Sequence, residues 1–334
     1  MNIGITIPSL HVAGGIKCLL KVASGLRARG HKVTCYWRSY STLNHLKSLF
    51  IPPIVRWTEE PHQVVPVLEW SDIPRHDALI ASSWRTATPV CAWSQSTGGK
   101  GLYYIQHHEA MWDGGEEAAA TYKLPLKQVV ISSWLQTTMK QVYGQESTVL
   151  VTPVDEALFQ EVNPRPDRPQ RVLLLHHTFD WKGFPEGVAA IEEVRRTHPR
   201  LQPVVLAGRE RPAGLPAGYE VHFQPGPKEL RQLYAGCGIF LCSSWHEGLG
   251  MPAMEAMATG ALLVTTDTGG SRDYAIQGQT AWVSLPRDPK GLARGLAQGL
   301  ERWDELEPMR HKGQAKIREF QWGRNLDILE SLLR

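Results

Sequence analysis

The chain contains one pattern twice: a short apolar segment, a glycine-containing turn, an amphipathic helix and another short apolar segment. In the first copy, residues 2–8 (NIGITIP) and 31–37 (HKVTCYW) predict strands on either side of a helix. Apolar residues recur at spacings of three and four in that helix, and Gly30 follows it as a C-terminal cap would. Successive parallel strands need such a crossover, so the pattern predicts a parallel sheet.

The pattern begins again after a polar segment at 160–171 (QEVNPRPDRPQR), whose three prolines predict a linker. Residues 171–177 (RVLLLHH) and 202–208 (QPVVLAG) predict the second pair of strands. Further strands are predicted at 77–83, 101–106, 128–133, 238–244 and 261–267. The sequence therefore predicts two Rossmann-like domains of the α/β class, with parallel sheets.

The length of 334 residues also suggests two domains. We expect an N-terminal domain at 1–162 and a second domain at 170–315. The last segment is amphipathic, and we expect a helix at 316–334 that crosses back to the first domain.

The net charge of +3 argues against a nucleic-acid partner and leaves room for an acidic substrate or peripheral contact with a membrane surface. The cysteines are odd in number and form no C-x-x-C pair, so reduced thiols and a cytoplasmic location are expected. The start of the chain does not resemble a signal peptide, and no apolar run is long enough to span a membrane. The five cysteines are Cys18, Cys35, Cys91, Cys237 and Cys242.

The segment 246–260 (HEGLGMPAMEAMATG) predicts a ligand site at the start of a helix. Pro252 suits a first helical turn, and we expect a helix at 251–259 with Gly260 as its stop. The unpaired N–H groups of a helix start attract anions, and Gly248 and Gly250 would leave that approach open. Glu247 and Glu255 would flank it, with no basic residue nearby in the sequence.

Two interpretations of these glutamates are open. Side chains of a helix lean towards its N-terminus, so Glu255 could accept two hydroxyl groups, as from a ribose, beside a bound phosphate. Alternatively, Glu247 is a solvated loop charge and Glu255 a surface helix residue.

The segment 247–274 (EGLGMPAMEAMATGALLVTTDTGGSRDY) resembles the E-x7-E signature of retaining glycosyltransferases of family 4. The resemblance implies the GT-B fold, with two facing Rossmann-like domains. It also implies that Glu247 contacts the donor sugar, that Glu255 binds the nucleotide ribose, and that backbone N–H groups of Leu249 to Met251 hold the diphosphate.

The same resemblance assigns roles to other loops. It implies that Gly14 and Gly15 close over the donor phosphate, although a glycine pair is also typical of a tight turn. His108, with His107 as the alternative, would meet the transferred sugar. Gly208 and Gln224, at expected strand ends, would lie near the base, although either could equally be a plain loop residue.

Lys182, in the pair Lys182–Gly183, would bind the diphosphate unless it is a solvated loop residue. Members of the family usually have an arginine shortly before this lysine, whereas this chain has His176 and His177 there. A protonated histidine could replace that cation, and alternation along a strand would direct only one of the two to the site.

The sequence thus predicts transfer of a sugar from a nucleoside-diphosphate sugar to an acceptor hydroxyl, with retention of configuration and without a cofactor. The acceptor would be a glycan, a lipid-linked molecule or a small molecule, in the synthesis of a cell-envelope or exopolysaccharide glycan. No D-x-D triplet or zinc-type spacing is present, so no metal is expected. The alternatives are a nucleotide-sugar epimerase and a non-catalytic nucleotide-sugar-binding protein, whereas an NAD enzyme would need a G-x-G-x-x-G fingerprint.

Overall fold

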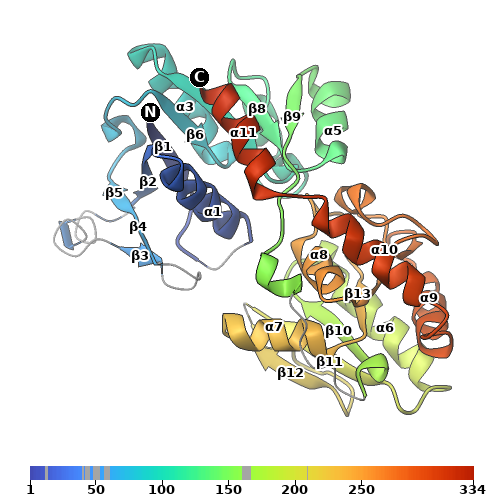
Figure 1. Ribbon diagram of the computed structural model, residues 1–334. Coiled ribbons are helices and arrows are strands. Elements are labelled where there is room, and N and C mark those ends of the chain that lie inside the picture. Colours follow the sequence, from blue (N-terminus) through green and yellow to red (C-terminus); the bar gives the residue numbers. More distant parts are fainter. Residues whose placement is uncertain are drawn as a thin grey trace. The chain divides into compact units, whose positions relative to one another are not determined.

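The computed structural model describes residues 1–11, 14–39, 41, 46–47, 53–55, 61–159, 167–208 and 210–334. Contacts divide the chain into two compact units (Figure 1). Unit 1 contains Met1–Thr152 and Gln321–Arg334, and unit 2 contains Pro153–Phe320. Each unit is built on one parallel sheet with helices against it, which confirms the prediction of two Rossmann-like α/β units.

The sheet of unit 1 has seven parallel strands. The side chains of Ile3, Ile5 and Ile7 in its β1 are fully buried, as expected where helices cover both faces of a parallel sheet. In sheet order the strands are β5 Val65–Val67, β2 Lys32–Arg38, β1 Asn2–Ile7, β6 Ala78–Ala81, β7 Lys100–Ile105, β8 Lys127–Val130 and β9 Ser147–Val149. The longer helices of residues 1–152 are α1 Gly14–Ala28, α3 Trp84–Thr97, α4 Gly115–Thr121 and α5 Ser133–Tyr143, and β3 Ile54–Val55 pairs with β4 His62–Gln63 in a small antiparallel sheet.

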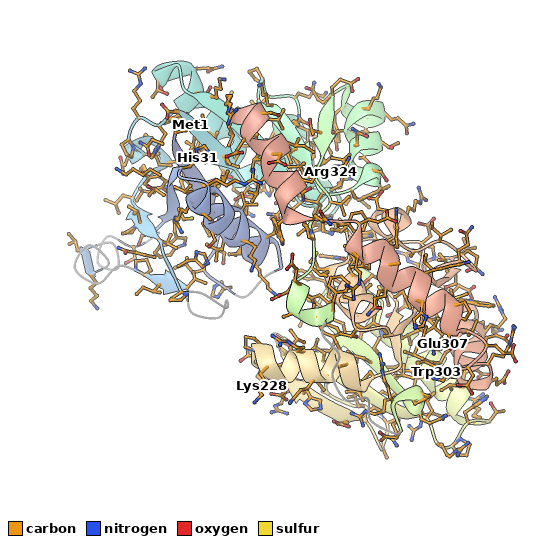
Figure 2. All side chains as sticks on the ribbon, viewed as in Figure 1. Met1, His31, Lys228, Trp303, Glu307 and Arg324 are labelled. Carbon is orange, nitrogen blue, oxygen red and sulfur yellow. The ribbon has the colours of Figure 1, made fainter. Side chains whose placement is uncertain are left out.

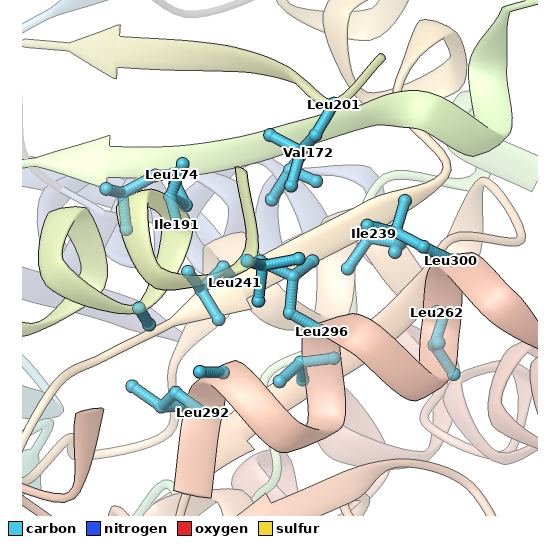
Figure 3. Packing of buried hydrophobic residues seen from close by; sticks show 14 residues of the cluster. Val172, Leu174, Ile191, Leu201, Ile239, Leu241, Leu262, Leu292, Leu296 and Leu300 are labelled. Carbon is cyan, nitrogen blue, oxygen red and sulfur yellow. The ribbon is translucent and has the colours of Figure 1, made fainter. Parts of the chain in front are cut away.

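The sheet of unit 2 has six parallel strands. In sheet order they are β12 Glu220–Phe223, β11 Gln202–Ala207, β10 Arg171–His176, β13 Ile239–Cys242, β14 Leu262–Thr266 and β15 Trp282–Ser284. The helices are α6 Phe184–Arg195, α7 Pro227–Gly236, α8 Met251–Ala258, α9 Pro289–Glu301 and α10 Glu307–Arg318. Figure 3 shows the core between sheet and helices, where Leu174 and Leu241 of the strands meet Ile191 of α6 and Leu296 of α9.

The predicted strands were found. Six described strands were not predicted: the two-residue β3 and β4, and four strands at the edges of the parallel sheets. The edge strands are β5, β9, β12 and β15, each only three or four residues long. The side chains of β9, β12 and β15 are more exposed than those of the central strands, so these segments lack the buried apolar runs from which the others were predicted. Strand β5 lies in the apolar segment 64–68, which Pro66 interrupts.

The division between the units differs from the predicted boundaries. Unit 1 ends at Thr152, and the η3 turn at Glu156–Phe159 belongs to unit 2, where the Arg318 guanidinium lies 4.4 Å from the centre of the Phe159 ring. Residues 160–166 of the predicted linker lie outside the described residues. The described end of the predicted linker, residues 167–171, belongs to unit 2. There the Arg168 carbonyl accepts a hydrogen bond from Gly238 N at 2.8 Å.

The C-terminal segment forms two helices rather than the single predicted one. Helix α10 belongs to unit 2, and α11 (Trp322–Leu333) belongs to unit 1. Between them Gln321 has an extended backbone, which breaks the helix where the chain changes units. The amphipathic pattern continues through this break, and therefore a sequence pattern alone predicts one helix.

Helix α11 packs beside α1, which confirms the predicted return of the chain to the first unit (Figure 2). A Cβ atom at Gly25 of α1 would lie only 2.5 Å from Leu326 Cδ1, so the glycine permits close packing. Arg29 binds Asp327 at 2.6 Å and Glu330 at 2.8 Å, and His31 Nε2 lies 2.6 Å from Glu330. Among the described helices, none is long and apolar enough to cross a membrane.

Candidate functional site

Three loops of unit 2 meet at the carboxyl ends of β10, β13 and β14, the edge where open α/β sheets bind ligands. Backbone hydrogen bonds connect them: Trp245 N donates to Trp181 O at 2.7 Å, and Glu247 N donates to Thr268 O at 2.9 Å. Gly270 N donates to Glu247 O at 3.2 Å. The backbone of Glu247 is therefore fixed on both sides by the loop after β14.

Lys182 and Glu247 form an ion pair at this edge. The Lys182 Nζ lies 2.8 Å from Oε1 and 2.9 Å from Oε2 of Glu247, and Ser244 Oγ donates to Oε1 at 2.7 Å. The two charged side chains are only 18% and 11% exposed. Glu247 thus has a neutralising partner that lies 65 positions away in the sequence, which the local pattern could not reveal.

Gly183 brings Lys182 against the end of β13. Its φ of +60° is in the left-handed region, and a Cβ atom there would lie 2.0 Å from the Ser243 carbonyl oxygen. No other residue can fit so close to this backbone, so the pair Lys182–Gly183 fixes where the lysine side chain begins.

Helix α8 begins as predicted. Gly250, with a φ of +90°, precedes its first residue, and a Cβ atom at Gly250 would lie 2.6 Å from the Tyr274 hydroxyl. That hydroxyl donates to Leu249 O at 2.9 Å and to Gly250 O at 3.2 Å. The helix ends at Ala258, followed by Gly260 with a φ of +79°. The backbone before α8 is therefore held in a shape that places its N-terminal N–H groups and positive dipole end at the site.

Glu255 lies in the second turn of α8 and is buried. Its Oε2 accepts a hydrogen bond of 2.8 Å from the hydroxyl of Tyr234 in α7. Burial, and then the nearby carboxylate, raise the pKa of Tyr234 well above its ordinary value, so this hydroxyl remains a donor. Glu247 is 8% exposed and Glu255 9% exposed. The alternative that both are solvated surface charges is wrong.

The cavity beside the ion pair is narrow. Lys182, Ser244, Glu247 and the start of α8 line a space of ≈ 10 Å³. A volume of about 10–15 Å³ on this measure holds a single water. This space beside the Lys182–Glu247 pair, at the end of the sheet, is thus about the size of one water molecule.

Gly208 and Gln224 come together after β11 and β12. Gln224 Nε2 donates to Gly208 O at 3.1 Å, and Gln224 N donates to Ala207 O at 2.8 Å. Gln224 has a φ of +50°, an uncommon value for a residue with a side chain. The structure thus brings these two residues into contact and leaves their expected role at the base as a prediction.

The two histidines at the end of β10 differ in their surroundings: His176 is the last residue of the strand, and His177 follows it. The His176 ring packs edge-on against Phe184, with 4.6 Å between ring centres, and its buried Nδ1 has no hydrogen-bond partner in the described part of the chain. His177 Nδ1 accepts a hydrogen bond of 3.1 Å from Phe179 N. The Phe179 ring stacks on Trp181 at 4.3 Å, and Trp181 lies nearly parallel to His246 at 5.9 Å.

Three residues that were not predicted hold Glu247, Glu255 and the turn before α8, in that order: Ser244, Tyr234 and Tyr274. Ser244 stands three positions before Glu247 in the sequence. This spacing predicts a contact only once the turn between the two residues is known. The two tyrosines contact the site only through tertiary packing. His246 was also missed, and burial lowers its pKa.

In unit 1, the predicted residues lie after β7 among aromatic rings. His108 Nε2 is 2.7 Å from the Tyr143 hydroxyl, and the rings of Tyr122, Trp134 and Tyr143 have their centres 5.7–6.4 Å from that of His108. His107 Nδ1 accepts from His108 N at 3.0 Å, and its ring lies edge-on to Trp112 at 3.7 Å. Both histidines are thus held by neighbours within unit 1.

Glu109, next to His108, is half-buried and contacts the start of α3. Its Oε2 accepts hydrogen bonds from Trp84 N at 2.8 Å and from the Tyr103 hydroxyl at 3.3 Å. Burial raises the pKa of Glu109 to about 7, although the bond from Trp84 opposes this shift. This carboxyl group therefore titrates near neutral pH.

Gly14 and Gly15 are the first two residues of α1 rather than a loop ahead of it. A Cβ atom at Gly15 would lie 3.0 Å from Gln106 Oε1, so a larger residue would press on that side chain. Residues 12 and 13 lie outside the described residues. Over the described ranges, no group of three or more His, Cys, Asp or Glu side chains could hold a metal ion.

The family described as glycosyl transferases group 1 matches residues 155–316. A glycogen synthase of Mycobacterium tuberculosis is 26% identical over 74% of this chain and 66% of its own length. A D-inositol 3-phosphate glycosyltransferase of Corynebacterium efficiens is 33% identical over 32% of this chain and 25% of its own. The matches thus span no more than two thirds of these curated relatives. These matches support the interpretation that this chain is a glycosyltransferase.

Solved structures resemble almost the whole chain. Anabaena HepE in complex with UDP and glucose aligns with a TM-score of 0.80 and 16% identity over 99% of both chains. A sucrose-phosphate synthase from Thermosynechococcus elongatus aligns with a TM-score of 0.78 and 15% identity over 99% of this chain and 98% of its own. At this identity the likeness concerns the fold. The chain has the α/β GT-B fold expected from its sequence.

Proposed function

We propose that this protein is a retaining glycosyltransferase that moves a sugar from a nucleoside-diphosphate sugar to an acceptor hydroxyl. The observation that carries the proposal is the Lys182–Glu247 ion pair at the glycine-bounded start of α8, inside the segment that matches group 1 glycosyl transferases. The presence of UDP and glucose in the complex of Anabaena HepE, which shares the fold, supports a donor of this class.

In this proposal the donor binds unit 2. Lys182 and the N–H groups at the start of α8, from Leu249 to Met251, receive the diphosphate. Glu247 accepts hydrogen bonds from hydroxyl groups of the sugar. Glu255, held by Tyr234, accepts hydrogen bonds from the ribose, and Gly208 and Gln224 lie at the base.

The acceptor binds unit 1, with His108 on the side of the transferred sugar and Gly14 and Gly15 near the phosphate. During the reaction the bond from the anomeric carbon to the diphosphate oxygen breaks, and that carbon bonds to the acceptor oxygen on the same face. The acceptor proton passes to the departing phosphate. Lys182 and the helix start stabilise the negative charge that develops there, which is where fixed charges lower a barrier most.

The experiment that tests this function has two stages. A thermal-shift screen of UDP, ADP, GDP and dTDP and their sugar esters identifies the donor, because a ligand of the native state raises Tm by mass action. The matching donor is then incubated alone and with a panel of glycan, lipid-linked and small-molecule acceptors. A glycosylated product with retained configuration supports the proposal.

Other outcomes identify the rivals. Conversion of the donor sugar without acceptor indicates an epimerase, and binding without conversion indicates a nucleotide-sugar-binding protein. Acceptors of cell-envelope and exopolysaccharide synthesis belong in the panel, since an O-antigen chain mannosyltransferase of Escherichia coli is among the relatives, at 30% identity over 28% of this chain. We further propose that the enzyme acts in the cytoplasm, in peripheral contact with a membrane where its acceptor is lipid-linked.

We also propose that transfer needs no metal ion or other cofactor. The charge of the diphosphate is offset by Lys182 and the start of α8, and no D-x-D triplet is present to hold a metal on it. Activity should therefore be unchanged in EDTA. Loss of activity that Mn²⁺ or Mg²⁺ restores would refute this part of the proposal and leave sugar transfer intact.

A further inference from the structure

Two donors of different kinds hold the Glu247 carboxylate. The first is Lys182 Nζ, which reaches both oxygens from the end of a four-carbon chain. The second is Ser244 Oγ, which binds Oε1 at 2.7 Å from within the same loop. The lysine is a flexible side chain with rotatable donors, whereas the serine hydroxyl lies one bond from its own Cβ.

The proposed function makes a second demand on Lys182. A diphosphate carries more negative charge than one carboxylate, and an ammonium group has three N–H donors, of which the Glu247 oxygens engage two in this structure. A donor diphosphate at the start of α8 that takes more than the one remaining N–H would therefore draw Lys182 away from Glu247. The carboxylate then loses the partner that neutralises it at the moment when it must be oriented towards the sugar.

The position of Ser244 is fixed by its burial and by its backbone. It is 4% exposed at the end of β13, and its carbonyl accepts a hydrogen bond from Thr266 Oγ1 in the neighbouring strand. The Glu247 backbone is held independently by Thr268 and Gly270. Neither contact involves Lys182, so the Ser244–Glu247 bond does not depend on where the lysine points.

We propose that Ser244 is a positioning residue that keeps the Glu247 carboxylate oriented when the donor diphosphate draws Lys182 away from it. This inference rests on the proposed function. The two residues then have different roles. Lys182 moves from the Glu247 carboxylate to the diphosphate, and Ser244 holds the carboxylate in place while the lysine is away.

The test compares Ser244→Ala, Glu247→Gln and the double variant with wild type. The probe is the nucleoside diphosphate among UDP, ADP, GDP and dTDP that raises Tm most, together with its glucose and mannose esters. Calorimetry gives the Kd of each. The Kd of the diphosphate divided by the Kd of its tighter-binding sugar ester, called the Kd ratio, measures what the sugar adds to binding. Steady-state kinetics with the best acceptor give kcat and KM. Ser94→Ala is the control, because its hydroxyl donates to Gly99 O at 2.6 Å between α3 and β7 in unit 1.

We expect Ser244→Ala to lower kcat about tenfold, the typical effect of one lost hydrogen bond to a charged group, and to keep the Kd of the diphosphate within about twofold. The Kd ratio should fall, and the double variant should show the ratio of Glu247→Gln alone, because Ser244 acts through Glu247. Wild-type kcat in Ser244→Ala, or a further fall of the ratio in the double variant, would overturn the inference. If wild type binds none of the four diphosphates, the proposed function itself fails.

Discussion

The carboxyl edges of the two sheets are built from different chemistry. In unit 2, Lys182, Ser244 and Glu247 form a charged cluster between loops that are fixed by their backbones. In unit 1, the carboxyl edge carries His108 inside a group of aromatic rings and a half-buried carboxyl group, Glu109, in contact with the start of α3. One edge presents an ion pair, and the other presents aromatic surfaces and a group that titrates near neutrality.

This difference suggests how the two units divide the proposed reaction. A lysine beside the start of a helix suits a diphosphate, whose binding and departure are governed by electrostatics. Rings with polar tips, such as Tyr143 and Trp112, suit an acceptor that has apolar faces and hydroxyl groups. The four predictions below test this division, beginning with the largest expected effect.

Glu247→Gln should lower kcat about 100-fold or more, the usual scale for removing one group that stabilises the transition state. The Kd of the nucleoside diphosphate should stay close to that of wild type, because the expected partner of Glu247 is the sugar. Steady-state kinetics and calorimetry measure the two effects. His108→Ala is the counterpart in unit 1 and should cost less. An equal loss in both variants would break the comparison between the edges.

Glu109→Gln should make the free energy of unfolding less dependent on pH. Burial raises the pKa of Glu109 to about 7 in the folded protein. The folded state therefore binds more protons than the unfolded state from about pH 4.5 to 7, and wild-type stability falls as the pH rises through this window. The full effect is about 3 kcal/mol at 1.36 kcal/mol per pKa unit.

Urea denaturation at pH 5 and pH 8 measures this effect. The amide that replaces the carboxyl group in Glu109→Gln still offers an oxygen to Trp84 N and carries no charge, so the stability of this variant should change little between the two pH values. Glu117→Gln, at an exposed position of α4, serves as control and should keep the wild-type profile. A wild-type profile in Glu109→Gln would show that the half-buried carboxyl group does not set the pH dependence.

Glu255→Ala should weaken donor binding by about 1–3 kcal/mol, the range for lost hydrogen bonds to a charged group. Tyr234→Phe removes only the hydroxyl that holds Glu255 and should weaken binding less. Calorimetry with the nucleoside diphosphate identified by the screen measures both. Unchanged affinity in both variants would mean that Glu255 is a structural residue of α8.

The smallest expected effect concerns the histidines at the end of β10. If one of them is the second cation for the diphosphate, donor affinity falls as the pH rises above neutrality. His177 Nδ1 accepts a hydrogen bond from Phe179 N and cannot carry a proton without losing it, so His176 is the better candidate. We expect His176→Ala to flatten the pH dependence of the donor Kd, and His177→Ala to leave it in place. Should neither variant change it, Lys182 and the start of α8 bind the diphosphate unaided.

Much of the fold was predictable because strand, turn and helix signals are local. The span from Glu247 to Glu255 lies within one turn and one helix, so its glycines and Pro252 predicted where α8 begins. The same holds for the strands with four or more buried side chains in a row, such as β1 and β6. The edge strands β9, β12 and β15 lack that signal, because none of their side chains is fully buried.

Contacts between distant segments were not predictable. The partners Lys182 and Glu247 come from the ends of neighbouring strands, and sequence spacing does not show that these strands are neighbours. The same applies to His108 and Tyr143, which lie 35 positions apart. The change of unit after Thr152 was missed because the linker was predicted from its prolines. The actual division depends on which side chains pack together.

The return of α11 to unit 1 has a consequence for biosynthesis. Unit 2 is one continuous segment, Pro153–Phe320, whereas unit 1 is completed only by residues 321–334. On the ribosome, unit 2 therefore has all its residues before unit 1 does, although unit 1 is begun first. Until α11 emerges, the face of α1 around Gly25 lacks Leu326, and Arg29 and His31 lack Glu330. A nascent chain of this protein must protect that apolar face for the whole time that unit 2 is being made.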